Sequence, residues 1–363
     1  MRFNKLILLF IASVLPSIIH GQAADSEIDL RSRKEEAIKE INHLLTYAKD
    51  TTNLLSIEQW VIADLEEKKQ LLDTLTQDLR REIANIEFYI GCAYHSLNDE
   101  RNIFRWFMRA AQLEQARAQY NIGVSFEYGY LGQEIDLDKA IHWYTKAAEQ
   151  HESGALLNLG ALYYHGKGVE QNCQKAFDYL MESGNAGNAE ALGNIGTMYN
   201  KGKCFKRDAQ KAISYFLQAA EAGAYKYYTY IGQLYHTGDG VKRNRKQALH
   251  YFHQASERHH PEGICHEAAC YYNGDGTKKD YDKAFQLVTS LEPEKRTGIG
   301  CALLGECYRL GRGIEKDIRK AAYWYNQAFI KGYEPALKEI KKLQKRKEIS
   351  KEDFEKNPEE NNN

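Results

Sequence analysis

The chain has 363 residues, 27% of them charged, and a formal net charge of -1 at pH 7. This near balance argues against a nucleic-acid-binding protein, which needs a concentration of lysine and arginine. Seven cysteines is an odd number, so in an oxidising compartment at least one stays free or pairs between chains.

Residues 1–23 are typical of a cleavable secretory signal. A short basic start precedes an apolar run over residues 6–15, and the small-x-small pattern Gly21-Gln22-Ala23 marks the cleavage site. The run is shorter than the roughly 20 residues that span a bilayer, although a retained anchor is the alternative. We therefore expect an exported protein, periplasmic or secreted, with no membrane span in its mature form.

Residues 24–81 predict two long charged helices, each with one apolar stripe. Ser56 and Gln59 resemble a capping box at the start of the second helix. One interpretation is a helical hairpin that caps the array described next, because such arrays need polar ends. The other is a coiled-coil arm for self-association through residues 25–81.

Residues 82–347 repeat with a period of 36 or 37 residues, apart from a first step of 32. We number each unit from a reference position in its first helix; these positions are Gly91, Gly123, Gly160, Gly196, Gly232, Ala268 and Gly305. An aromatic residue follows at position +3, and in all units but the first a glycine follows at +6. Apolar residues recur at helical spacing in each unit, which predicts about seven stacked helix pairs.

A glycine inside a helix costs about 1 kcal/mol relative to alanine, so its recurrence predicts a close approach of the second helix. We expect a small residue such as Ala212 to lie opposite the glycine, with Tyr215 and Phe216 filling the space beside it. Paired loop glycines such as Gly166 and Gly168 predict helix caps with positive φ. No strand precedes them, so a phosphate-binding loop is disfavoured.

The pattern A-x4-G-x2-Y-x2-G-x-G-V, followed by A-x2-W/Y-Y/F-x2-A-A, resembles the Sel1-like repeat over about residues 84–341. The resemblance implies an all-α, right-handed solenoid whose first helices line a concave groove, and a role in holding other proteins together. Two departures stand out: Cys204 replaces a loop glycine, and the sixth unit has Ala268 at its reference position with Leu287-Val288 in place of the aromatic pair. A final helix within residues 334–347 is expected to cap the array, and the charged residues 348–363 are expected to be disordered.

If the first helices line a groove, residues at -3, +1, +4 and +5 face it, and polar and aromatic side chains there suit an extended peptide. The predicted binding residues are Tyr120, Glu127, Tyr128, Leu157, Tyr164, His165, Asn200, Lys201, Thr229, Gln233, His236, Tyr272, Asn273, Glu306 and Arg309.

Cys173 and Cys204 lie in the loops of consecutive units and form the disulfide that we favour. The other five cysteines fall in first helices, and most of them are interpreted as buried core residues. His250 and His253 are spaced to share a metal ion, but their neighbours face the core, so we interpret them as solvated.

The H-E-x-x-H box fails at Cys270, and neither the β-lactamase motifs nor G-x-S-x-G occurs. We predict no catalytic residue, no metal site and no cofactor. The predicted function is a non-catalytic scaffold that binds a protein or peptide, with a bacterial envelope or host-directed adaptor as the specific form. The alternatives are a eukaryotic adaptor in the lumen of the secretory pathway, and a hydrolase or metal-binding protein.

Overall fold

The computed structural model describes residues 77–95 and 98–345. The chain divides into two compact units, Met1–Ile83 and Ala84–Asn363, and α5 and all later helices belong to the second. The predicted signal, the predicted tail and all but the last few residues of the predicted N-terminal hairpin therefore lie outside the described residues.

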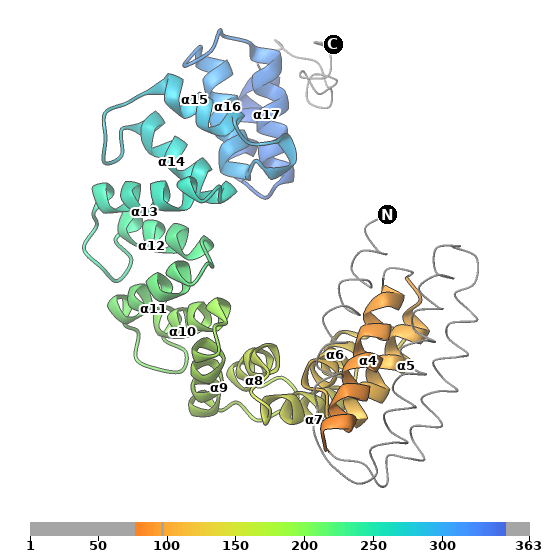
Figure 1. The fold of residues 1–363 in the computed structure, drawn as a ribbon. Coiled ribbons are helices and arrows are strands. Elements are labelled where there is room, and N and C mark those ends of the chain that lie inside the picture. The colour runs from red at the N-terminus through yellow and green to blue at the C-terminus, as the bar shows by residue number, and fades with distance from the viewer. Residues whose placement is uncertain (1–76, 96–97, 346–363) are drawn as a thin grey trace, which may run out of the picture. The chain divides into compact units, whose positions relative to one another are not determined.

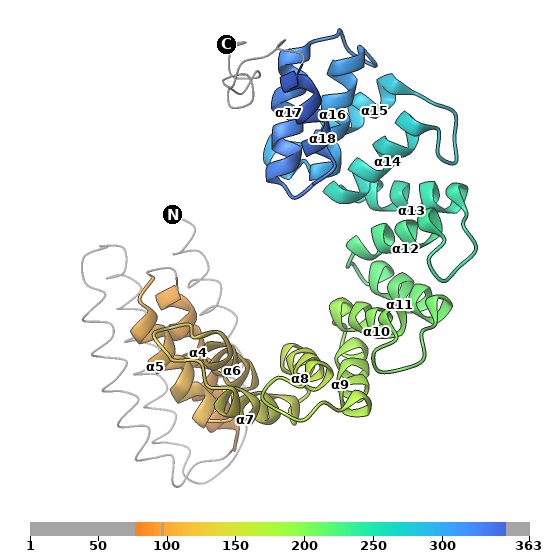
Figure 2. The ribbon, with the colours of Figure 1, turned by 180° about the vertical axis from the view of Figure 1, so that it is seen from behind.

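The described part of the chain is all-α, with no strand, and its helices follow one another in pairs from α4/α5 to α16/α17 (Figures 1 and 2). The helices are α4 (Gln77–His95), α5 (Glu100–Gln112), α6 (Ala116–Tyr128), α7 (Leu137–Ala148), α8 (Ser153–His165), α9 (Cys173–Asn185), α10 (Ala189–Lys201), α11 (Ala209–Glu221), α12 (Lys226–Thr237), α13 (Arg245–Glu257), α14 (Pro261–Asn273), α15 (Tyr281–Thr289), the 3-10 helix η1 (Pro293–Lys295), α16 (Gly298–Leu310), α17 (Ile318–Ile330) and α18 (Ala336–Lys345). The predicted all-α repeat fold is confirmed.

Short polar residues and glycines set the helix ends. From α7 to α17 every second helix begins after an Asp or Asn whose side chain accepts a backbone N–H from the first turn, as Asp208 does from Lys211. From α6 to α16 every first helix ends at a glycine with φ between 67° and 78°, as at Gly166. The predicted glycine caps are confirmed.

Within each described pair except α14/α15, the two helices touch at the reference glycine. A Cβ atom added to Gly123 would lie 2.5 Å from the Tyr144 ring, and one added to Gly232 would lie 2.5 Å from the Phe252 ring. The predicted close approach is therefore confirmed, but the predicted partner is wrong. The space is filled by the second residue of the bulky pair, because the buried alanine lies one turn earlier and presents only its backbone there.

A second contact lies beside the glycine in the pairs α8/α9, α10/α11 and α12/α13. The +3 tyrosine stacks on a tyrosine of the second helix, with ring centroids 5.8 Å apart for Tyr199 and Tyr215 and 5.9 Å apart for Tyr235 and Tyr251. In α8/α9 and α10/α11 a lysine from the second helix also lies over the +3 ring, as Lys211 does 5.3 Å from the Tyr199 centroid. Aromatic stacking and cation–π contact thus fix the rotation of one helix against the other.

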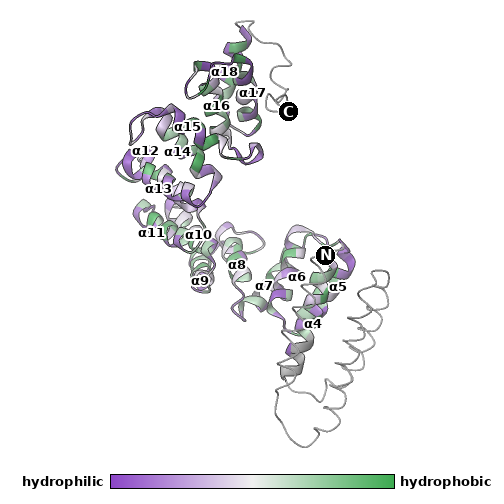
Figure 3. Ribbon diagram, turned by 45° about the horizontal axis from the view of Figure 1, so that its top comes forward, coloured by the Kyte–Doolittle hydropathy of each residue, from purple (hydrophilic) through white to green (hydrophobic). Residues whose placement is uncertain are grey.

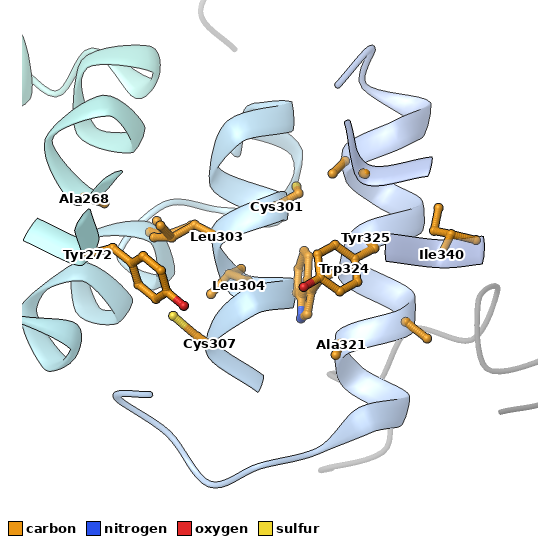
Figure 4. Packing of buried hydrophobic residues seen from close by; sticks show 14 of the residues in the cluster. Ala268, Tyr272, Cys301, Leu303, Leu304, Cys307, Ala321, Trp324, Tyr325 and Ile340 are labelled. Carbon is orange, nitrogen blue, oxygen red and sulfur yellow. The ribbon is translucent and has the colours of Figure 1, made fainter. Parts of the chain in front are cut away.

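Hydrophobic residues of neighbouring pairs merge into shared clusters, and the labelled helices carry both hydrophobic and hydrophilic residues, as amphipathic helices do (Figure 3). Figure 4 shows the last cluster, in which Leu304 of α16, Tyr325 of α17 and Ile340 of α18 lie together. Because α18 buries Ala336, Ile340 and Leu343, it covers the end of the array, as expected. Four of the five first-helix cysteines are also buried, as predicted: Cys265, Cys270, Cys301 and Cys307.

The sixth unit, α14/α15, has alanine in place of the reference glycine, and its packing explains why. Val288 occupies the position that a ring or leucine takes in the other described repeats, and both Val288 and Ala268 are fully buried. The smaller valine leaves room for the alanine methyl group, so the two departures compensate each other.

We predict that Val288→Phe alone lowers the free energy of unfolding by about 1–3 kcal/mol, because the ring would overlap the Ala268 methyl group. Adding Ala268→Gly should restore much of that loss, although Ala268→Gly alone should destabilise by about 1 kcal/mol. Urea unfolding of the four proteins measures the coupling. If the losses simply add, the ring and the methyl group do not compete for space.

Candidate functional site

The predicted binding residues concentrate at the C-terminal ends of the first helices. There each helix ends with positions +4 and +5, followed by the capping glycine at +6 and the loop residue at +7; in the α8 unit these are Tyr164, His165, Gly166 and Lys167. From α8 onward these loops join the two helices of a pair along one edge of the array, where each loop meets the preceding unit (Figure 1).

Position +4 of one unit contacts position +7 of the next. The pairs are Glu127 with Lys167 (3.4 Å, Oε1 to Nζ), Tyr164 with Lys203 (5.0 Å, ring centroid to Nζ), His236 with Asp275 (3.2 Å, Nε2 to Oδ2) and Tyr272 with Arg312 (3.1 Å, hydroxyl to guanidinium nitrogen). In each pair a cation meets an anion or an aromatic ring, or a histidine meets a carboxylate. The +4 side chains therefore hold neighbouring units together.

Two of the predicted residues are also held inside a unit. The Tyr144 hydroxyl donates to Glu127 Oε2 at 2.8 Å, and Asn158 donates to the Tyr144 hydroxyl. Burial, then the Glu127 carboxylate, raises the pKa of Tyr144 well above its ordinary value, so this phenol stays protonated as a donor. The Tyr325 hydroxyl donates to Glu306 in the same way, at 2.8 Å.

Asn200 is the exception to this pairing. Asp239, at +7 of the next unit, forms an ion pair with Arg207 at 2.6 Å instead. Arg207 Nε donates to the backbone carbonyl of Asn200, so the arginine links the two positions.

The structure separates the predicted residues by exposure. Glu127, Tyr164, Thr229 and Tyr272 are buried; Tyr120, Leu157, Asn200, Gln233, His236, Glu306 and Arg309 are half-buried; Tyr128, His165, Lys201 and Asn273 are exposed. The placement of Thr229 in a groove is wrong, because Thr229 is fully buried and its hydroxyl lies 3.3 Å from His260 Nδ1. Gln233 likewise contacts the next first helix, with its amide 3.3 Å from Glu262.

The four exposed residues all occupy position +5. We call Tyr128, His165, Lys201 and Asn273 the +5 row. Two neighbours of this row were not among the predicted binding residues. Tyr130, 57% exposed, stacks on Tyr128 with centroids 5.6 Å apart, and Lys167 lies 5.5 Å from the Tyr128 centroid. A comparison of the residue type at each +7 position with that at the +4 position one unit earlier would have distinguished residues that join neighbouring units from exposed ones.

Cys173 and Cys204 are joined by a disulfide, with their Cα atoms 5.3 Å apart. Elsewhere the second loop glycine packs against the first residue of the preceding second helix: a Cβ added to Gly240 would lie 2.7 Å from Ala209. Cys204 stands at this glycine position, and Cys173 is the first residue of α9. At this junction a covalent bond thus takes the place of the packing contact that joins neighbouring units elsewhere.

In the histidine-rich region, His253 contacts Glu267. His253 is exposed, and its Nδ1 lies 2.9 Å from Oε1 of Glu267, which is buried. Within residues 77–95 and 98–345, no three histidine, cysteine or acidic side chains gather as a metal site would require. The same residues include no helix that combines the length and apolar character of a membrane span.

Comparison with known proteins matches the repeats to one family. The sequence profile of the Sel1 repeat matches residues 116–151, 153–188, 189–223, 226–260, 265–289 and 298–333. The fold is similar to that of a protective antigen present in uropathogenic Escherichia coli strains, with a TM-score of 0.63 and 24% identity over 77% of this chain and 62% of the antigen. It is also similar to a Sel1 repeat protein from Oxalobacter formigenes, with a TM-score of 0.59 and 25% identity over 66% of this chain and 98% of that protein.

A shorter similarity links the chain to an ERAD-associated E3 ubiquitin-protein ligase component of Arabidopsis thaliana. The two are 33% identical over 78 residues, which is 22% of this chain and 12% of the plant protein. The chain therefore spans only a small part of the length of this relative.

We predict that Cys173→Ser with Cys204→Ser lowers the free energy of unfolding by roughly 2–4 kcal/mol, because the open chain gains conformational entropy. Thermal unfolding with and without dithiothreitol measures this: reduction should weaken the wild type and leave the serine variant unchanged. Equal stability of the two proteins without reductant would contradict the role of the bond.

Proposed function

Because the chain belongs to the Sel1 repeat family, whose members generally act as protein-interaction scaffolds, we propose that it is a non-catalytic, exported scaffold that binds a protein or peptide along its first helices. The bound segment lies across the C-terminal ends of consecutive first helices. No cofactor takes part in this function.

The +5 row carries the proposal. Its four side chains are exposed, whereas the +4 residues beside Tyr128 and His165 are buried against the next unit. The backbone beneath the exposed residues is therefore fixed before a partner arrives, which lowers the entropy that binding must overcome. Tyrosine, histidine, lysine and asparagine supply the aromatic faces and hydrogen-bonding groups that an extended peptide needs.

Two observations support export. Residues 1–23 have the basic, apolar and small-residue order of a secretory signal. The Cys173–Cys204 bond suits an oxidising compartment, because disulfides rarely persist in a reducing cytosol.

We propose a bacterial envelope or host-directed adaptor as the specific form. The similar folds from Escherichia coli and Oxalobacter formigenes support this form. The similarity to the Arabidopsis component favours a second candidate, an adaptor in the lumen of the eukaryotic secretory pathway.

We predict that replacing the whole +5 row with serine weakens capture of the native partner while leaving helicity and the unfolding midpoint nearly unchanged. Each exposed residue should affect stability by no more than about 0.5 kcal/mol. Quantitative mass spectrometry of proteins recovered from native extract, with circular dichroism of the same samples, measures both effects.

The matched control replaces four exposed residues of the second helices, namely His142, Asp178, His250 and Gln286, with serine. This control should recover the same partner as the wild type. A partner lost equally from both variants, or from neither, would contradict binding along the first helices.

A further inference from the structure

A local excess of positive charge lies on two consecutive units of a chain that is almost neutral overall. His165 ends α8 and Lys201 ends α10, both at position +5, while Lys167 and Lys203 occupy position +7 of the same two units. All four side chains are exposed. We call these four residues the basic patch.

Two of the lysines are held over aromatic rings. Lys203 Nζ lies 5.0 Å from the Tyr164 centroid and 3.3 Å from the Tyr164 carbonyl oxygen. Lys167 Nζ lies 5.5 Å from the Tyr128 centroid and 3.4 Å from Glu127 Oε1. The ammonium groups are thus positioned by contacts that also stack the units, so a partner need not order them.

The three lysines of the basic patch all affect the pKa of His165. Partial burial, followed by the positive charges of Lys203, Lys201 and Lys167, lowers the pKa of His165. The imidazole therefore remains neutral at pH 7, and the ring adds a donor or acceptor beside three cations. A negatively charged ligand that offsets the lysines should raise this pKa.

We infer that the basic patch binds an acidic, extended segment of the partner protein, with the stacked Tyr128–Tyr130 pair next to Lys167 receiving an apolar side chain. The inference rests on the proposed scaffold function and specifies its partner. Opposite charges bring the acidic segment to the patch and fix its position. The exposed tyrosine faces provide the apolar contact that charges alone lack.

Charge and size distinguish this ligand from nucleic acid. The patch has three lysines, fewer than the roughly six to ten phosphate contacts of a strongly salt-dependent DNA-binding protein. The exposed carboxylate of Glu170 lies in the same loop as Lys167 and would repel a long polyanion. A short acidic stretch of polypeptide needs fewer cationic contacts than nucleic acid and is too short to be repelled in this way.

Fluorescence anisotropy with the full chain tests the inference. The probes are fluorescein-labelled peptides (Glu-Leu-Glu-Tyr)4 and (Gln-Leu-Gln-Tyr)4, and a 16-nucleotide oligothymidylate. The acidic peptide should bind, and more weakly as salt rises, whereas the glutamine peptide and the oligonucleotide should bind at least about tenfold more weakly.

Lys201→Glu with Lys203→Glu should weaken binding of the acidic peptide about tenfold or more, and the milder Lys201→Gln with Lys203→Gln should weaken it less. The matched control, Lys338→Glu with Lys341→Glu on α18, changes net charge equally at exposed residues and should bind as the wild type does. NMR titration should show an upward shift of the His165 pKa when the acidic peptide is bound.

Equal binding of the two peptides, unchanged binding by both patch variants, or tighter binding of the oligonucleotide would overturn the inference. If the +5 row is required for native capture while the acidic peptide does not bind, the scaffold function stands and only the acidic partner is excluded. If neither the native partner nor the acidic peptide depends on these residues, both proposals fail.

Discussion

In every described helix pair except α14/α15, the reference glycine lies directly against a bulky side chain of the second helix. The Phe252 ring occupies the space that a side chain at Gly232 would need, and Val288 with Ala268 shows a compensated version of the same contact. Helix propensity alone would favour alanine at these positions. The repeated glycine therefore reflects packing, and it brings the two helices close enough for the tyrosine stacking beside it.

A second constraint acts between units and determines which residues are available to a partner. Contacts from position +4 to position +7 of the next unit bury Glu127, Tyr164 and Tyr272, while Tyr128 and His165 at +5 remain exposed. The Cys173–Cys204 bond reinforces this junction once. The +5 row thus lies one position away from the +4 residues that hold the array together, whereas Lys167 and Lys203 of the basic patch also take part in those contacts.

The fold was predictable because it depends on a pattern within one unit: period, glycine caps and buried small residues all recur in the sequence. The candidate site was predictable only in part, because its exposure depends on contacts between units. Helical spacing placed both Tyr164 and His165 on the binding face, but the loop residue Lys203 of the next unit covers Tyr164. The burial of Thr229 has the same kind of origin, a contact with His260 at the start of the next unit.

The account depends most on partner contact at the +5 row. Photo-crosslinking in the native organism, with benzoylphenylalanine in place of Tyr128 and, in a separate protein, in place of His142 on the second helix α7, tests this contact directly. The account predicts that position 128 yields a specific polypeptide adduct, that position 142 does not, and that the crosslinked partner segment is rich in Asp and Glu. Adducts from position 142 alone, or none from either position, would contradict it.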